Sequence, residues 1–245
     1  MSTAAIRRDS VRIAGIVAAD PSAVVPACPG WDVRDLVVHL GGVHRWVLEC
    51  VETAAPPARA RATDPVPDTP DDPDALAAWM IDGATTLADV LAGRDPSEPT
   101  WTPFRVDDPT VAFWIRRQTH ETSVHRVDAE DAVDSRTPIE PVIAADGVDE
   151  YLELILPRRV ARDGLVLPAG SAHLHCTDTE GEWTLEVGPD GGYVLDRTHR
   201  KGDAAVRATA EHLLLLLWAR PLPGGSVDVI GDEAVAAAWT GLGGT

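Results

Sequence analysis

The chain has 245 residues, a length that suits one large domain or two small ones, and its formal net charge is −18 at pH 7. Its hydrophobic fraction of 44% and charged fraction of 24% are typical of a soluble globular protein. Because an acidic surface repels phosphate backbones and anionic lipids, the charge argues against nucleic acids and membranes as partners.

The cysteines and the apolar runs indicate the cellular compartment. Cys28, Cys50 and Cys176 are dispersed without a CxxC spacing, which suits a reducing cytoplasm better than a disulfide framework. The N-terminal segment lacks the apolar run of a signal peptide, and the run "LLLLLWA" at 213–219 is far too short to cross a bilayer. We therefore expect a soluble, cytoplasmic protein.

Four helices are predicted in the first part of the chain. Apolar spacing predicts helices over residues 3–19, 31–52, 74–93 and 109–132. Asp32 lies where a carboxylate favours a helix N-terminus, and Gly41 and Gly42 should let another group approach the second helix closely. Residues 54–73 carry six prolines and no apolar period, so we expect a loop there. This pattern predicts a four-helix bundle over residues 1–141.

The pattern changes after Pro141. A helix over about 142–161 precedes three alternating runs, "AHLHCTD", "EWTLEVG" and "GYVLDR", which predict a small antiparallel sheet. An apolar helix over 203–220, a strand "SVDVIG" and a helix "DEAVAAAWTGL" complete the chain. We therefore expect a two-domain α+β protein, with an α+β accessory domain over residues 142–245.

The stretch "THETSVHRVDAE" in the fourth helix contains a candidate metal-binding pair. Glu121 and His125 are one helical turn apart and share a face, so they are either an ordinary surface pair or two ligands of one ion. An open zinc site takes three such ligands and leaves a position for water or substrate. The second helix offers His39 or His44 as the third, and its periodicity places His39 on the inward stripe and His44 nearer the edge. Spacing alone leaves both interpretations open.

Two blocks of the sequence, "VPACPGWDVRDLVVHLGGVHRW" and "HETSVHRVDAE", together resemble the mycothiol-dependent maleylpyruvate isomerase family of actinobacteria. That family belongs to the DinB-like group of metal-binding four-helix bundles, and the resemblance covers essentially the whole chain. It implies a divalent metal, usually zinc, bound by the histidine eight residues after the "GW" tryptophan and by the Glu and His of the later helix. In this chain these ligands are His39, Glu121 and His125, and the resemblance makes His44 and His120 neighbours of the site.

The resemblance also implies an enzyme that uses mycothiol as its thiol cosubstrate. The metal-bound thiolate would add to a small electrophile, giving either cis–trans isomerisation or thiol transfer. An unsaturated dicarboxylate substrate needs a cationic partner, and Arg220, at the end of the apolar helix, is the expected catalytic residue by family position. Arg116, Arg117 and Arg126 flank the metal motif, and surface salt bridges are their ordinary explanation.

Four further interpretations remain open. The chain is alternatively a metal-binding regulatory or interaction protein without catalytic activity, although three ligands argue against a purely structural zinc. The accessory domain distantly resembles sterol-carrier-type domains, which would bind an apolar ligand. His173 and His175 alternate on a predicted strand, a spacing that suits a metal pair, and Asp128 either orients a ligand imidazole or holds Arg126.

Overall fold

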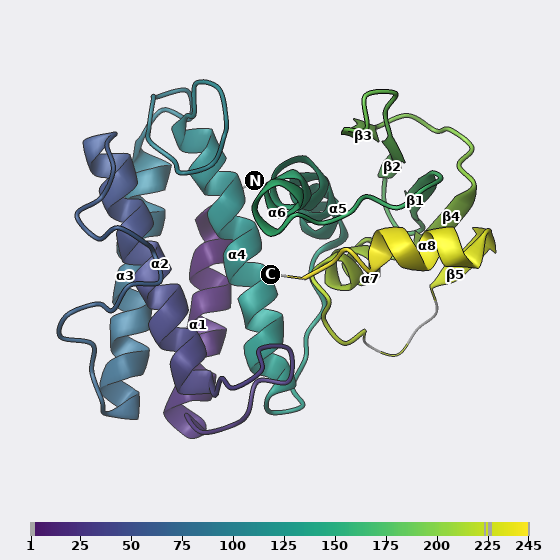
Figure 1. The fold of residues 1–245 in the computed structure, drawn as a ribbon. Helices are drawn as coiled ribbons and strands as arrows, with labels where there is room; N and C mark the ends of the chain where they lie inside the picture. Colours follow the sequence, from purple (N-terminus) through teal and green to yellow (C-terminus); the bar gives the residue numbers. More distant parts are fainter. Residues whose placement is uncertain (1–2, 223, 225–226, 245) are drawn as a thin grey trace. The chain divides into compact units, whose positions relative to one another are not determined.

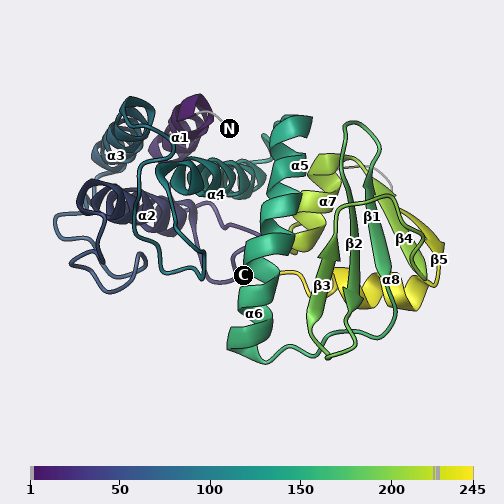
Figure 2. The same ribbon diagram turned by 90° about the horizontal axis from the view of Figure 1, so that it is seen from above.

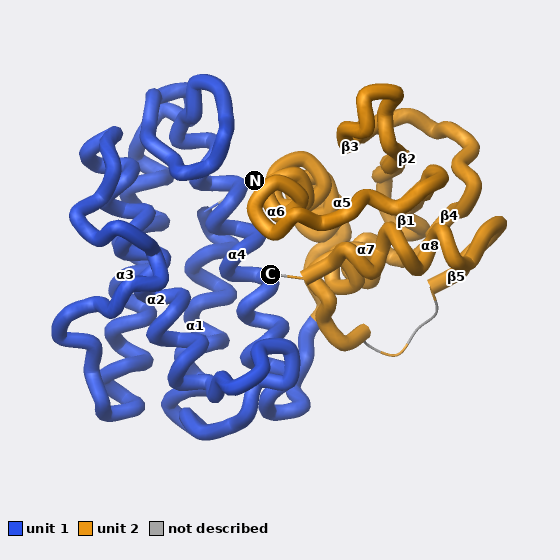
Figure 3. Tube along the Cα trace, viewed as in Figure 1, with its two compact units in different colours: residues 1–137 blue, residues 138–245 orange. Residues whose placement is uncertain are grey.

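A computed structural model describes residues 3–222, 224 and 227–244 of the chain. The polypeptide divides into two compact units, which we call the helical unit (residues 1–137) and the sheet unit (residues 138–245) (Figure 3). The first four helices of the chain belong to the helical unit, and the described strands all belong to the sheet unit.

The helical unit is a four-helix bundle, as the sequence predicts (Figure 1). Its helices are α1 (Thr3–Ala19), α2 (Val33–Thr53), α3 (Pro73–Gly93) and α4 (Val111–Asp131). Asp32 begins α2 with a capping box, because its carboxylate accepts from the Asp35 amide at 2.9 Å and the Asp35 carboxylate accepts from the Asp32 amide at 3.2 Å. This cap fixes the register of the helix that carries His39.

The two glycines of α2 admit close neighbours, as expected. A Cβ atom on Gly41 would lie 2.1 Å from the Trp79 ring, so only glycine allows this packing. The carbonyl of Gly42 accepts from the Arg59 guanidinium at 2.6 Å, which anchors the proline-rich loop against α2. That loop has no helix or strand over residues 54–72, which confirms the prediction.

α3 is long and apolar enough, by length and composition, to cross a membrane. Its buried side chains Leu76, Met80 and Leu87 pack into the two hydrophobic clusters of the bundle. Because the core helix of a bundle has the same composition as a membrane span, we assign α3 to the core.

The sheet unit combines helices with a five-stranded sheet (Figure 2). Its elements are α5 (Pro141–Glu150), a π-helical turn η1 (Tyr151–Ile155), α6 (Leu156–Asp163), β1 (Ala172–Cys176), β2 (Glu182–Val187), β3 (Tyr193–Asp196), β4 (Ala204–Ala208), α7 (Ala210–Leu217), β5 (Asp228–Gly231) and α8 (Glu233–Thr240). The π-helical turn precedes Pro157, whose ring cannot join a regular α-helical hydrogen-bond ladder.

The three predicted strands β1, β2 and β3 pair antiparallel, as expected, and β4 and β5 extend them into a mixed sheet. Its strand order is β3-β2-β1-β4-β5, with β4 parallel to β1 and the other neighbours antiparallel. The predicted helix over 203–220 contains β4, because the alanines of "AAVRA" favour helix locally while burial alternates along the strand. Since β2 and β1 separate β3 from β4, the connecting residues 197–203 must cross both strands.

Candidate metal centre

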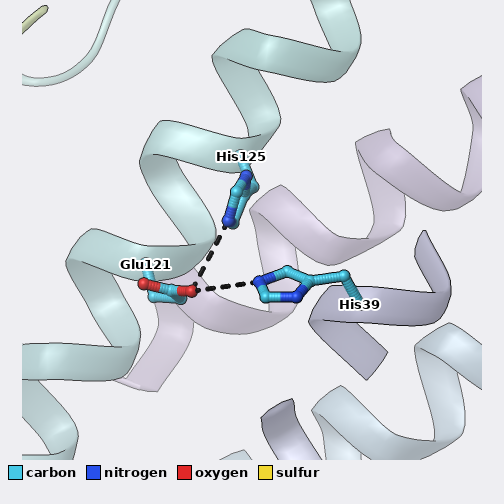
Figure 4. Close-up of side chains that lie close together, drawn as sticks. All are labelled: His39, Glu121 and His125. Atoms are coloured by element: carbon cyan, nitrogen blue, oxygen red, sulfur yellow. Dashed lines mark ion pairs between the residues drawn. The ribbon is translucent and has the colours of Figure 1, made fainter. Parts of the chain in front are cut away.

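Three side chains from two helices of the bundle meet at one point (Figure 4). His39 projects from α2, while Glu121 and His125 project from one face of α4, and one ligand atom of each lies within 4.8 Å of the other two. Glu121 Oε1 lies 3.7 Å from His39 Nε2 and 3.5 Å from His125 Nε2. The structure therefore brings together all three residues named from the sequence.

The carboxylate of Glu121 is held in its charged form by its neighbours. Its second oxygen, Oε2, accepts from the Arg117 guanidinium at 2.5 Å, one helical turn earlier on α4. Burial acts to raise the pKa of Glu121, but Arg117 and the hydrogen bonds of His125 and His39 outweigh burial and hold this pKa well below its usual value. Glu121 is thus a permanent anion facing two imidazoles. Arg117, expected as a surface cation, is instead buried against it.

His125 is oriented by Asp128, three residues later on α4. Its Nδ1 lies 3.0 Å from Asp128 Oδ2, so its Nε2 faces Glu121 and His39. Burial acts to lower the pKa of His125, yet hydrogen bonds to Asp128 and Glu121 raise this pKa to about 9. Carboxylate–histidine pairs of this kind fix the ring of a metal-ligating histidine. Cys28 Sγ lies 3.8 Å from the same Asp128 oxygen.

An open cleft gives solvent access to His39. The cleft has a volume of about 430 Å³ and is lined by Trp31, Asp35, Val38, His39 and loop residues 62–66. The Trp31 ring lies 5.0 Å from the His39 ring, and the side chain of His39 is 18% exposed. The cleft is therefore lined by one candidate ligand of the cluster formed by His39, Glu121 and His125.

His44 is more deeply buried than His39, so its predicted place near the edge of the stripe was wrong. It is fully buried, and its Nε2 lies 3.1 Å from Thr122 Oγ1 across the bundle. The apolar stripe of α2 is wide because both α3 and α4 pack against this helix. Burial lowers the pKa of His44 to about 3, so the imidazole is neutral and serves packing.

This burial predicts an acid-sensitive contribution to stability. The unfolded chain binds a proton at His44 near pH 6.5, whereas the folded chain resists it until about pH 3, so folding is progressively disfavoured as pH falls below 6.5. Between pH 7.5 and pH 5 the metal-free protein should lose about 2 kcal/mol more stability than a His44→Gln variant. Urea unfolding at both pH values measures this difference. Equal losses of stability in the two proteins would show that His44 takes up its proton while it is still inside the folded core.

A buried charge network ties α4 to α1. Arg126 Nη1 donates to Glu130 Oε2 at 2.6 Å, and its Nε lies 3.6 Å from Asp9 Oδ1. Ser123 donates to the other Asp9 oxygen at 2.9 Å. Asp9 was not predicted from the sequence. The spacing of the sequence could have indicated it: Asp9 lies three residues after Ile6 and four before Ile13, so it shares the helix face of these two buried residues.

Arg220 lies in the sheet unit, three residues after the last residue of α7. Its guanidinium donates to the Trp218 carbonyl at 2.8 Å and lies 5.9 Å from the Trp218 ring centroid, and the side chain is buried. Because Arg220 and the three-residue cluster belong to different units, its role toward the metal centre stays a prediction. His120 is buried beside Glu121 in sequence and does not belong to the three-residue cluster.

Comparison with known proteins assigns both units. The sequence family described as "Mycothiol maleylpyruvate isomerase N-terminal domain" matches residues 3–130, and that described as "MDMPI C-terminal domain" matches residues 142–238. A solved structure of "the mycothiol-dependent maleylpyruvate isomerase" has a TM-score of 0.58 and 13% identity, covering 93% of this chain and 90% of that chain. A histidine-to-alanine mutant of that isomerase has the same TM-score and coverage at 12% identity. No curated protein sequence matches the chain.

Proposed function

The chain belongs to the mycothiol maleylpyruvate isomerase family, and from this premise we propose that it is a metal-dependent and mycothiol-dependent enzyme acting on a small electrophile. The observation that carries the proposal is the convergence of His39, Glu121 and His125, of which His39 lines an open cleft. A cluster of potential metal ligands that a cosubstrate can reach is the arrangement expected of a catalytic site.

The donor set fits a divalent metal. Two imidazole nitrogens and a carboxylate oxygen are ligands that Zn²⁺ prefers, and three protein ligands leave a position for an exogenous group. When bound, the metal would supply Lewis acidity that lowers the pKa of a coordinating thiol, so that the thiol binds as thiolate near neutral pH. His39, Glu121 and His125 would hold the metal, and Arg117 and Asp128 would keep Glu121 and His125 in position.

We propose that the cleft beside His39 receives the thiol cosubstrate. It is open to solvent, and its wall includes the Trp31 ring and the polar residues Asp35 and Asp64. The electrophile would be an unsaturated dicarboxylate, as in cis–trans isomerisation of maleylpyruvate, or another acceptor of the thiol. In either reaction Arg220 is the proposed cation for a substrate carboxylate. The free cysteines are consistent with an enzyme that acts in a reducing cytoplasm.

A direct assay tests this proposal. Metal-loaded protein is incubated with mycothiol and maleylpyruvate, and the loss of the cis substrate is followed. Turnover that requires both metal and mycothiol is the expected result. If mycothiol binds but the cis substrate is not consumed, the isomerase reaction is wrong, and thiol transfer to other electrophiles is assayed by loss of free mycothiol.

The competing proposal is a metal-binding regulatory or interaction protein. The cleft lined by His39 favours the enzyme over a closed structural metal site, because a metal with four protein ligands needs no approach for an exogenous group. The two proposals differ in the coordination of the bound metal. Absorption spectroscopy of the Co²⁺-substituted protein should change on adding mycothiol if the enzyme proposal is right, and should not change if a fourth protein ligand closes the site.

A further inference from the structure

A second cluster of potential metal ligands lies on the sheet of the sheet unit. His173 and His175 come from β1 and Glu182 from the neighbouring β2, and one ligand atom of each lies within 4.8 Å of the other two. His175 Nδ1 lies 3.0 Å from Glu182 Oε1, and His173 Nε2 lies 4.0 Å from Glu182 Oε2.

Strand geometry places these three side chains on one face. His173 and His175 are two residues apart on β1, so both point to the same side, and Glu182 stands directly opposite His175 in the antiparallel register. The intervening Leu174 points to the other face and is fully buried. Two imidazoles and a carboxylate thus stand together on a rigid pair of strands.

One nitrogen of the cluster is buried without a hydrogen bond. His173 is only 5% exposed, and its Nδ1 lies 3.2 Å from Thr184 Oγ1. Its Nε2 makes no hydrogen bond to any residue that the structure describes, and it faces the Glu182 carboxylate from 4.0 Å. A buried polar atom without a partner costs free energy, so a ligand that uses this nitrogen would recover that cost.

The chain that crosses from β3 to β4 adds a third imidazole beside the cluster. His199 Nδ1 lies 2.7 Å from Glu182 Oε2, and its ring lies 5.4 Å from the His173 ring, edge to face. One carboxylate is therefore approached by three imidazoles. A single cation among these groups would satisfy the carboxylate and the imidazole nitrogens together.

We propose that His173, His175 and Glu182 form a second divalent-metal site, which takes Zn²⁺ or a cation of similar ligand preference. Imidazole nitrogens select such ions over Mg²⁺ and Ca²⁺, which prefer all-oxygen sites. Three protein ligands from β1 and β2 leave a fourth position for water or for His199. Because the bound ion would join two strands, it would stabilise the sheet unit.

Zinc binding to the full-length chain tests this site. The double variant His39→Ala/Glu121→Gln removes the centre in the helical unit, and Zn²⁺ is titrated into it by equilibrium dialysis with metal quantification. We expect one equivalent per chain. Adding Glu182→Gln should weaken this binding at least tenfold, and zinc should raise the melting temperature of the double variant but not of the triple variant.

Glu186→Gln is the matched control. Glu186 lies four residues later on the same strand and face, has similar exposure, and contacts Arg200 at 2.6 Å instead of the cluster. It should leave zinc affinity within about twofold. Absence of zinc binding in the double variant, or equal effects of the two glutamate changes, would overturn the proposal. If Glu182→Gln fails to fold by circular dichroism, His175→Gln, whose side chain is 30% exposed, replaces it with the same expectation.

Discussion

Replacing His39 by alanine should reduce turnover more than about 100-fold and remove about one equivalent of metal per chain relative to the wild type. Loss of a ligand is expected to exceed the 10- to 100-fold effect of losing a supporting group around a metal. Glu121→Gln should act similarly, because it removes the anion that both imidazoles face and leaves Arg117 without this carboxylate partner. Metal content after dialysis and steady-state turnover measure the two effects separately.

His44 provides the control on the same helix. It is a buried histidine on α2, and its Nε2 contacts Thr122 rather than the three-residue cluster. A His44→Gln variant should keep its metal and most of its turnover at neutral pH. If that variant stays folded but loses metal as His39→Ala does, the proposed ligand set is wrong.

The sequence predicted the candidate centre from the spacing of two residues within one helix and from one histidine, His39, in a helix far away in the sequence. Four-residue spacing put Glu121 and His125 on one face, and the same logic made Asp128 a candidate partner for a ligand imidazole. Helical periodicity favoured His39 over His44 and the family resemblance made the same choice, but periodicity ranked the burial of these two side chains in the wrong order. Periodicity gives the direction of a side chain, whereas burial depends on how many neighbouring helices cover that direction.

The parts of the fold that the sequence did not predict depend on contacts between distant segments. The bundle and β1, β2 and β3 follow from local patterns and were confirmed. β4 was hidden in an alanine-rich stretch. Its pairing with β1, from Ala172 opposite Ala204 to Cys176 opposite Ala208, and its pairing with β5 make it a strand. Asp9 was missed for the same reason, since its partner Arg126 is more than a hundred residues away in sequence.

The contact between Asp9 and Arg126 leads to the largest expected effect on stability. Replacing Arg126 by methionine should lower the free energy of unfolding by up to about 3–5 kcal/mol, because it removes the buried cation between Asp9 and Glu130 and leaves these carboxylates facing the half-exposed Arg8 and Arg12. Chemical denaturation of the metal-free protein, followed by tryptophan fluorescence, measures this change.

Arg12→Met is the matched comparison for this prediction. Arg12 contacts the same Glu130 at 3.0 Å, but its side chain is 45% exposed, so its loss should cost no more than about 1 kcal/mol. Equal losses in the two variants would mean that Glu130 is stabilised by solvent-exposed charge alone. A larger loss for Arg126 would show that the buried network holds α4, and with it Glu121 and His125, against α1.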